Sequence, residues 1–240
     1  MKPTNQFGLF VATAMIAIAC GGPSTTVETS EAQEVAVAEG KTLSIDPAAT
    51  SVSWRGYKPG GEHFGKIPAV QGEITIEGGQ IAAGTFTFDV VGLKIEDIPA
   101  EDENYGKLYG HLQSPDFFDA ATHPTATFEI TGVEPFNTGD VIADKEERAS
   151  EHTPKQDTDL TPANPTHWIS GNLTMRGTTK NIKFPAAVNI TDDSVTANAG
   201  FNIDRTNWGL SYGTESDPAN IAKDQFIYNN VSLILDVTAK

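Results

Sequence analysis

Apolar side chains recur at every second position in eight separate runs of this sequence, all of them after residue 43. Strict alternation places apolar residues on one face of a β-strand, whereas a helix would repeat them every three or four residues. Turn residues such as glycine and aspartate separate most of the runs, and some connections are short enough for hairpins. The runs lie at residues 52–54, 74–76, 86–90, 126–130, 169–175, 182–190, 195–203 and 231–237.

Eight strands with one apolar face each predict an all-β fold, an eight-stranded antiparallel β-barrel. Closure into a barrel removes the exposed edges that an open sheet would carry. A sandwich of two sheets would show the same alternation, so periodicity alone leaves that alternative open. We expect one β domain over residues 42–240, with a short helix over one end of the barrel. The helix is indicated by apolar residues spaced by three and four at Tyr105, Leu108, Tyr109 and Leu112.

The N-terminal residues indicate export. Residues 7–19 form an apolar run of 13, long enough for a signal peptide and too short to span a bilayer. We therefore expect residues 1–19 to be a signal peptide. Cys20, the one cysteine of the sequence, follows directly and resembles the lipid attachment site of bacterial lipoproteins; a plain secretory signal is the alternative. Gly21 favours the outer membrane by analogy with lipoprotein sorting. The expected location is the periplasm or the cell exterior, anchored to the outer membrane.

Two segments lack the alternation of the strands. Residues 20–41 are polar, acidic and free of aromatic side chains, so we expect a flexible tether between the lipidated cysteine and the domain. Residues 137–166 are rich in charge and have no periodicity. We expect them to form a long exposed loop inserted between two strands, and disorder is favoured over a functional loop.

The charge balance argues against several classes of partner. The sequence has 32 acidic residues against 16 Lys and Arg, a net charge of −16. Nucleic-acid binding is not expected, because its affinity depends on Lys and Arg that neutralise phosphates. An acidic surface also disfavours direct adsorption to an anionic membrane, which leaves the lipid anchor as the expected membrane contact. The sequence is compatible with a homodimer without specifying one.

Motifs for catalysis are mostly missing. The sequence has no Gly-rich phosphate loop and no G-x-S-x-G motif, and its one thiol belongs to the export signal. No two of the five histidines lie two or four positions apart, the spacings that place two imidazoles on one face of a strand or helix. We therefore expect no enzyme activity, no cofactor and no metal, and a site assembled from distant residues stays open.

His111 has two interpretations. It is either satisfied by a nearby carbonyl, Asp116 or Asp119, or it is a polar anchor near the mouth of a cavity. His63, in a glycine-rich loop, has the same two interpretations. A charged pair, Asp204 and Arg205, also ends one strand, and it either ties a loop to the barrel rim or fixes the polar head of a ligand.

Four motifs resemble one bacterial family when they are taken together in this order. They are Asp46-Pro47 with Ser51–Trp54; His111–Asp119 (HLQSPDFFD) with His123–Phe128 (HPTATF); Gly171–Gly177 (GNLTMRG); and Asp204–Gly209 (DRTNWG). They resemble the signature of the YceI-like family of bacterial polyisoprenoid-binding proteins, and the likeness extends from about Thr42 to the C-terminus. The resemblance implies a lipocalin-like antiparallel barrel that holds a long isoprenoid lipid in an apolar cavity.

The inward faces of the strands also favour a cavity. Ala126, Ala186, Ala197 and Ala199 alternate with phenylalanine rings, which leaves room for an apolar chain, whereas a solid core would use more Leu and Ile. The expected ligand-binding residues are Trp54, Phe86, Phe88, His111, Phe117, Phe118, Phe128, Phe201, Arg205 and Trp208.

The function expected from the sequence is therefore the non-enzymatic binding, storage or transport of a long isoprenoid lipid or quinone. Two alternatives stay open. One is an interaction or stress lipoprotein of the envelope with a solid barrel, and the other is a small hydrolase that uses His111 and His63 with nearby carboxylates.

Overall fold

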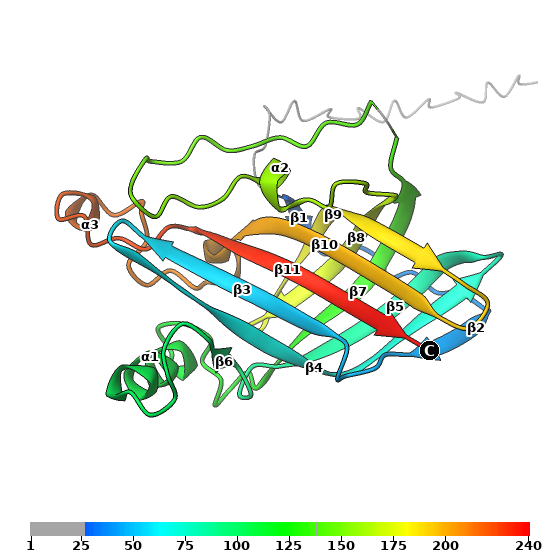
Figure 1. Cartoon of the computed structure of the whole chain (residues 1–240), viewed down its shortest axis with the longest axis horizontal. Helices are drawn as coiled ribbons and strands as arrows, with labels where there is room; N and C mark the ends of the chain where they lie inside the picture. Colours follow the sequence, from blue (N-terminus) through cyan, green and yellow to red (C-terminus); the bar gives the residue numbers. More distant parts are fainter. Residues whose placement is uncertain (1–26, 138) are drawn as a thin grey trace, which may run out of the picture.

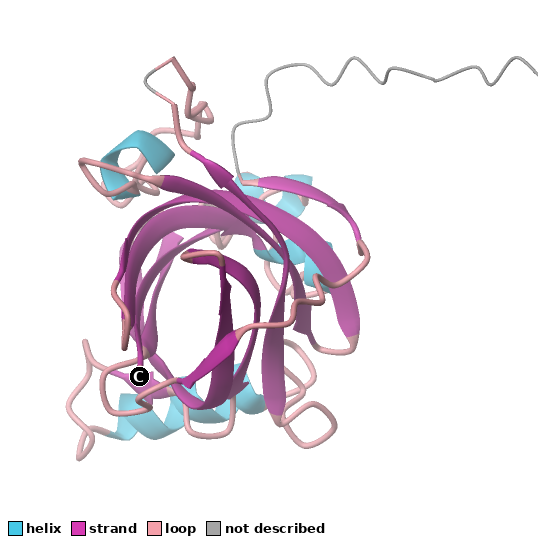
Figure 2. Ribbon diagram, turned by 90° about the vertical axis from the view of Figure 1, so that its right-hand side faces the viewer, coloured by secondary structure: helices cyan, strands magenta, loops and turns pink. Residues whose placement is uncertain are grey.

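Eight antiparallel strands form a closed ring in the computed structural model, which describes residues 27–240 apart from residue 138 (Figures 1 and 2). Around the ring the order is β3-β4-β5-β7-β8-β9-β10-β11, and β11 pairs with β3 to close it. Each alternating run of the sequence falls on one of these strands, with Val90 one residue beyond the end of its strand, so the predicted barrel is confirmed. The strands are β3 (Ser51–Lys58), β4 (Gly61–Glu77), β5 (Gln80–Asp89), β7 (Thr125–Pro135), β8 (His167–Met175), β9 (Thr178–Ile190), β10 (Val195–Asp204) and β11 (Asn230–Ala239).

The long strand β4 carries two short strands in addition to its barrel neighbours. β3 pairs with residues 61–68 of β4, and β5 pairs with residues 69–77. Each half of β4 therefore keeps one edge that no barrel strand covers. β6 (Lys94–Ile95) pairs with the first half, and β2 (Lys41–Ser44) pairs with the second. These short strands satisfy backbone groups that would otherwise be left open.

Part of the expected tether is a strand. β1 (Glu28–Glu31) pairs with residues 180–183 of β9, an edge that β10 leaves open because β10 pairs only with residues 186–190. Further along, the Asn172 side-chain amide exchanges two hydrogen bonds with the backbone of Gln33, at 2.9 and 2.7 Å. The expectation of an unfolded tether is wrong for these residues, because an open strand edge binds backbone groups whatever the side-chain pattern.

The predicted helix is confirmed and is slightly longer than the apolar spacing indicated. α1 (Glu103–Gln113) begins after Asp102, whose Oδ1 accepts a hydrogen bond from the Asn104 N–H at 2.8 Å. Leu108 and Leu112 on this helix border the interior of the barrel at one end. The remaining helical turns are α2 (Asp157–Leu160), η1 (Arg205–Trp208) and α3 (Pro218–Ile221).

The predicted loop at 137–166 lies against the outside of the barrel, and we call residues 139–166 the strap (Figure 1). Asp157 accepts a hydrogen bond from the Asn202 N–H at 2.6 Å, and the Asn202 side chain donates to the Lys155 carbonyl at 2.8 Å. The strap thus binds the part of β10 beyond Ala199, which β9 does not reach. The expectation of disorder is wrong, because the free backbone groups of β10 hold a segment that has no periodicity of its own.

The predicted signal peptide, residues 1–19, and Cys20 lie outside the described residues. Within residues 27–240, with 138 left out, we find no helix that is both long enough and apolar enough to cross a membrane.

Candidate functional site

The interior of the barrel holds a cavity of about 420 Å³. It is bordered at one end by α1, by the β3–β4 hairpin and by the segment around Tyr212, and we call this end the mouth. Its lining is mainly aliphatic and aromatic. A cavity of this size and character is typical of sites that bind small apolar molecules.

The side chains of β11 show that the interior is not solid. Val231, Leu233 and Leu235 face the cavity, and all three are only half-buried although they lie inside the barrel. They border empty volume instead of packing against opposite strands. The expected cavity is therefore present, and the solid interior of the alternative hypothesis is absent from the described part of the chain.

The structure brings eight of the ten predicted ligand-binding residues to the wall of the cavity. Phe86 lies deeper in the barrel and lines a separate small space. Trp208 lines neither space. The eight that line the cavity are Trp54, Phe88, His111, Phe117, Phe118, Phe128, Phe201 and Arg205.

Trp208 is part of the wall and not of the ligand site. Its side chain is fully buried, and its Nε1–H donates to the Leu173 carbonyl of β8 at 2.9 Å. The prediction that it contacts a ligand is therefore wrong. A tryptophan next to a charged pair does not reveal from the sequence which way its ring points, and here the buried indole N–H needs a carbonyl partner.

Arg205 borders the cavity but uses its guanidinium to tie the chain together. The guanidinium donates to the backbone carbonyls of Leu210, Ile227 and Tyr228. Burial lowers the pKa of Arg205 to about 10, so it remains charged at neutral pH. Asp204 instead accepts a hydrogen bond from the Thr206 N–H at 2.9 Å. These contacts agree with the first interpretation of the charged pair. Arg205 ties a loop to the barrel rim by donating hydrogen bonds to backbone carbonyls.

His111 stands on one side of the mouth between two aromatic rings. Its ring meets those of Phe117 and Tyr212 edge-on, with centroids 4.9 and 4.6 Å apart. Its Nε2 lies 3.3 Å from Asp116 Oδ2. His111 therefore has the expected carboxylate partner and also borders the cavity, while its role as a polar anchor stays a prediction. Tyr212 carried no sequence signal, because it lies in an irregular segment.

His63 stands on the hairpin side of the mouth. Its Nδ1 lies 2.7 Å from Asp97 Oδ2, while Asp97 Oδ1 accepts the Phe64 N–H at 2.9 Å. This carboxylate fixes the orientation of the imidazole. Beside it, Arg55 forms an ion pair with Glu62. Across the described range 27–240 without 138, no three His, Cys, Asp or Glu side chains are grouped as metal ligands would be.

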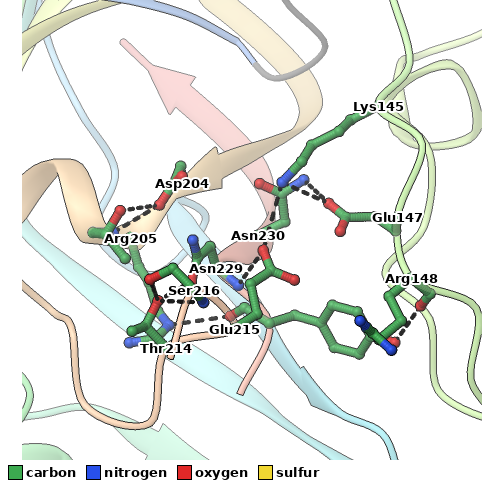
Figure 3. A network of polar contacts seen from close by, with 12 residues as sticks. Lys145, Glu147, Arg148, Asp204, Arg205, Thr214, Glu215, Ser216, Asn229 and Asn230 are labelled. Carbon is green, nitrogen blue, oxygen red and sulfur yellow. Dashed lines mark hydrogen bonds and ion pairs between the residues drawn. The ribbon is translucent and has the colours of Figure 1, made fainter. Parts of the chain in front are cut away.

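A cluster of polar side chains on the outside of the barrel holds the strap (Figure 3). Lys145 Nζ lies 3.2 Å from Glu147 Oε1 and 3.5 Å from Glu215 Oε1. Asn230, at the start of β11, donates to Glu147 Oε1 at 2.7 Å. Burial raises the pKa of Glu147. These four residues do not line the cavity, so they serve to attach the strap and not to contact a ligand.

Comparison with known proteins gives the same fold and a family. The model of the YceI-like domain matches residues 43–239. A UPF0312 protein of Azotobacter vinelandii is 34% identical over 112 residues, which span 43% of this chain and 43% of that relative, so less than half of the relative's length is matched.

Two solved structures have similar barrels. BcnA of Burkholderia cenocepacia has a TM-score of 0.55 and 17% identity, over 82% of this chain and 99% of that one. A polyisoprenoid binding domain from Saccharophagus degradans, implicated in plant cell wall breakdown, has a TM-score of 0.52 and 14% identity, over 82% of this chain and 97% of that one. At such identities the likeness shows the fold alone. The match to the domain model covers most of the sequence, and the chain therefore belongs to the YceI-like family.

Proposed function

We propose that this protein binds a long isoprenoid lipid or quinone in the barrel cavity and stores or carries it in the bacterial envelope without chemical turnover. The observation that carries the proposal is the apolar cavity of about 420 Å³ inside a YceI-like barrel. The similar barrel from Saccharophagus degradans is described as a polyisoprenoid binding domain, which supports the same class of ligand here.

Burial of apolar surface would drive binding. Each Å² of apolar surface removed from water contributes about 25 cal/mol. Transfer of a long prenyl chain from water into the cavity is therefore favourable by roughly ten kcal/mol or more. Most of this is offset when the lipid leaves a bilayer, which is about as apolar, and when its chain is ordered. The net free energy of transfer is then small, which suits a carrier or a reservoir that exchanges its lipid with a membrane.

The two ends of the cavity suit the two ends of such a ligand. His63, His111 and Tyr212 border the mouth, where a polar head group stays near water. Phenylalanine and aliphatic side chains line the interior, where the prenyl chain would lie. An eight-stranded barrel is wide enough for one slender ligand. The ligand would therefore bind with its head at the mouth.

Location in the envelope is the second part of the proposal. It rests on the signal peptide that the sequence predicts at residues 1–19 and on Cys20, which would carry the lipid anchor. Labelling of cells with a radioactive fatty acid tests it. We expect the full-length protein to be labelled in the outer-membrane fraction and the Cys20→Ser variant to be unlabelled, and a wild-type protein without label would contradict the anchor.

Native mass spectrometry of the full-length protein, followed by solvent extraction, tests the ligand. We expect an added mass that extracts into organic solvent and fragments in isoprene units. A matched pair of variants on β11 separates the cavity from the surface. Leu233→Glu places a charge in the cavity, whereas Ile234→Glu places the same charge on the exposed outer face of the same strand.

Leu233→Glu should lose the bound lipid, because a carboxylate is costly to bury beside a prenyl chain. Ile234→Glu should keep it. A wild-type protein that carries no lipid, and that binds no added prenyl chain saturably, would contradict the proposed function. Equal lipid content in the two variants would place the lipid outside the barrel.

A further inference from the structure

A row of phenylalanine rings crosses the interior of the barrel. Its four members come from β5, β7, β9 and β10. The ring centroids are 6.3 Å apart for Phe86 and Phe128, 5.8 Å for Phe128 and Phe184, and 4.2 Å for Phe184 and Phe201. All four side chains are buried. The row is therefore a continuous series of ring contacts across the inner face of the sheet.

The rings stand between two unequal spaces. The larger space, of about 420 Å³, reaches the mouth, while the smaller, of about 60 Å³, lies at the far end beside Ile74 and Ile81 of the β4–β5 hairpin. Phe88, Phe128 and Phe184 border both spaces. They therefore form part of the partition between the spaces, together with Leu235 from the opposite side of the barrel.

Phe128 packs directly against the backbone of the neighbouring strand β8, because Gly171 has no side chain there. Gly171 occupies an inward-facing position of β8, between β7 and β9. A Cβ atom on Gly171 would lie 2.2 Å from Phe128 Cζ, so the ring lies directly against the backbone of β8. Only 7% of Phe128 is exposed. Moving the ring would require neighbouring side chains to move as well, because protein interiors are close-packed.

We propose that this row of rings, with Phe128 at its centre, is the stop that sets how much of a ligand's chain the barrel can hold. The inference deepens the proposed function and rests on it for the class of ligand. A chain that enters by the mouth meets Phe128 and Phe184 once it has filled the larger space. Further units of a longer chain stay outside the mouth, where they gain no burial.

The test is a chain-length series on delipidated full-length protein. Prenyl alcohols of increasing length, and n-alkyl alcohols in parallel, displace a fluorescent fatty-acid probe. The wild type should gain affinity with length, by up to about fourfold for each methylene group buried, and then reach a plateau. Phe128→Ala should move the plateau to longer chains in both series, because it joins the two spaces.

The control is Ile130→Ala, which enlarges the deep space without removing a ring. Its plateau should stay at the wild-type length. Phe128→Leu serves if Phe128→Ala melts below the assay temperature, and it should give a smaller shift in the same direction. An unchanged plateau in the folded Phe128 variant would overturn the stop.

The two series distinguish this inference from the proposed function. A plateau that moves with alkyl alcohols, while no prenyl chain binds, would support the stop and overturn the prenyl ligand class. If no alcohol of either series binds saturably to the wild type or to any variant, both the stop and the proposed function are overturned.

Discussion

Trp208 combines a fully buried ring in the hydrophobic core with one buried hydrogen bond. Its indole donates to the Leu173 carbonyl, and no part of the side chain is exposed. We expect Trp208→Phe to lower the free energy of unfolding by about 1–3 kcal/mol, because a buried hydrogen bond is lost and the smaller ring leaves a cavity. Urea denaturation measures the change.

Trp168 is the matched control, since it is only half-buried and its Nε1–H donates to Asp140 Oδ2 at 2.7 Å. Trp168→Phe should cost less stability than Trp208→Phe. Equal losses in the two variants would show that burial of the Trp208 hydrogen bond is not what makes it important.

Asp157 is a buried carboxylate whose charge is costly to the folded state. Burial raises its pKa from 3.8 to about 6, although it accepts a hydrogen bond from the Asn202 N–H. The folded state therefore binds the proton more tightly than the unfolded state. The resulting destabilisation is fully present above about pH 6 and disappears as the pH falls below 3.8, the value of the unfolded chain.

We expect Asp157→Asn to be more stable than the wild type at about pH 8, by up to about 3 kcal/mol, since each pKa unit corresponds to about 1.4 kcal/mol. The asparagine oxygen still accepts the Asn202 N–H. The difference should shrink as the pH falls through about 6 and vanish below about pH 3.8. Chemical denaturation of both proteins at several pH values measures it, and a variant that is less stable at about pH 8 would show that the charge itself holds the strap.

At the scale of elements, the strap completes an edge that the barrel leaves open. Gly200 of β10 lies so close to the strap that a Cβ atom there would be 2.2 Å from the Leu160 carbonyl oxygen. The strap therefore needs a glycine at this position of β10. β1 completes the open edge of β9 in a similar way, by backbone pairing.

We expect Gly200→Ala to displace the strap locally, because the methyl group and the Leu160 carbonyl cannot share the same space. Hydrogen exchange by mass spectrometry should show faster exchange in residues 155–161, with the strands on the opposite side of the barrel unchanged. Gly132→Ala is the control, since the nearest atom to its Cβ would be 4.0 Å away. Unchanged exchange in Gly200→Ala would mean that the contact is not needed for docking.

At the scale of the whole molecule, the barrel folds around a space that its own side chains leave empty. The interior-facing side chains of β11 are half-buried for this reason. A ligand that fills the cavity binds the folded state alone, so it raises the free energy of unfolding. If the proposed ligand binds, stability and ligand content are therefore linked.

We expect a prenyl alcohol at a hundred times its dissociation constant to stabilise the delipidated protein by about 2.7 kcal/mol. Thermal melts with and without the alcohol measure the gain. Ile234→Glu should show the same gain, and Leu233→Glu should show little or none. An equal gain in Leu233→Glu would mean that the alcohol stabilises the protein from outside the cavity.

The fold could be predicted because alternation is a local property that eight runs repeat. The helix could also be predicted, because the apolar spacing of three and four from Tyr105 to Leu112 is a local property as well. Phe88, Phe128 and Phe201 were expected at the cavity because inward faces follow from the alternation of each strand. Tyr212 was not, since an irregular segment carries no period that predicts the direction of its side chains.

The sequence by itself determined the strands, their inward faces and the family motifs, because each depends on residues that are neighbours along the chain. Only the tertiary structure decided which strand edges stay open. It therefore also decided that residues 28–31 and 139–166 pack on the barrel. It also decided that Trp208 faces Leu173 and that Phe128 lies against Gly171. These contacts join residues that are dozens of positions apart in the sequence, and the physical reason is that close packing and backbone pairing are set by neighbours in space.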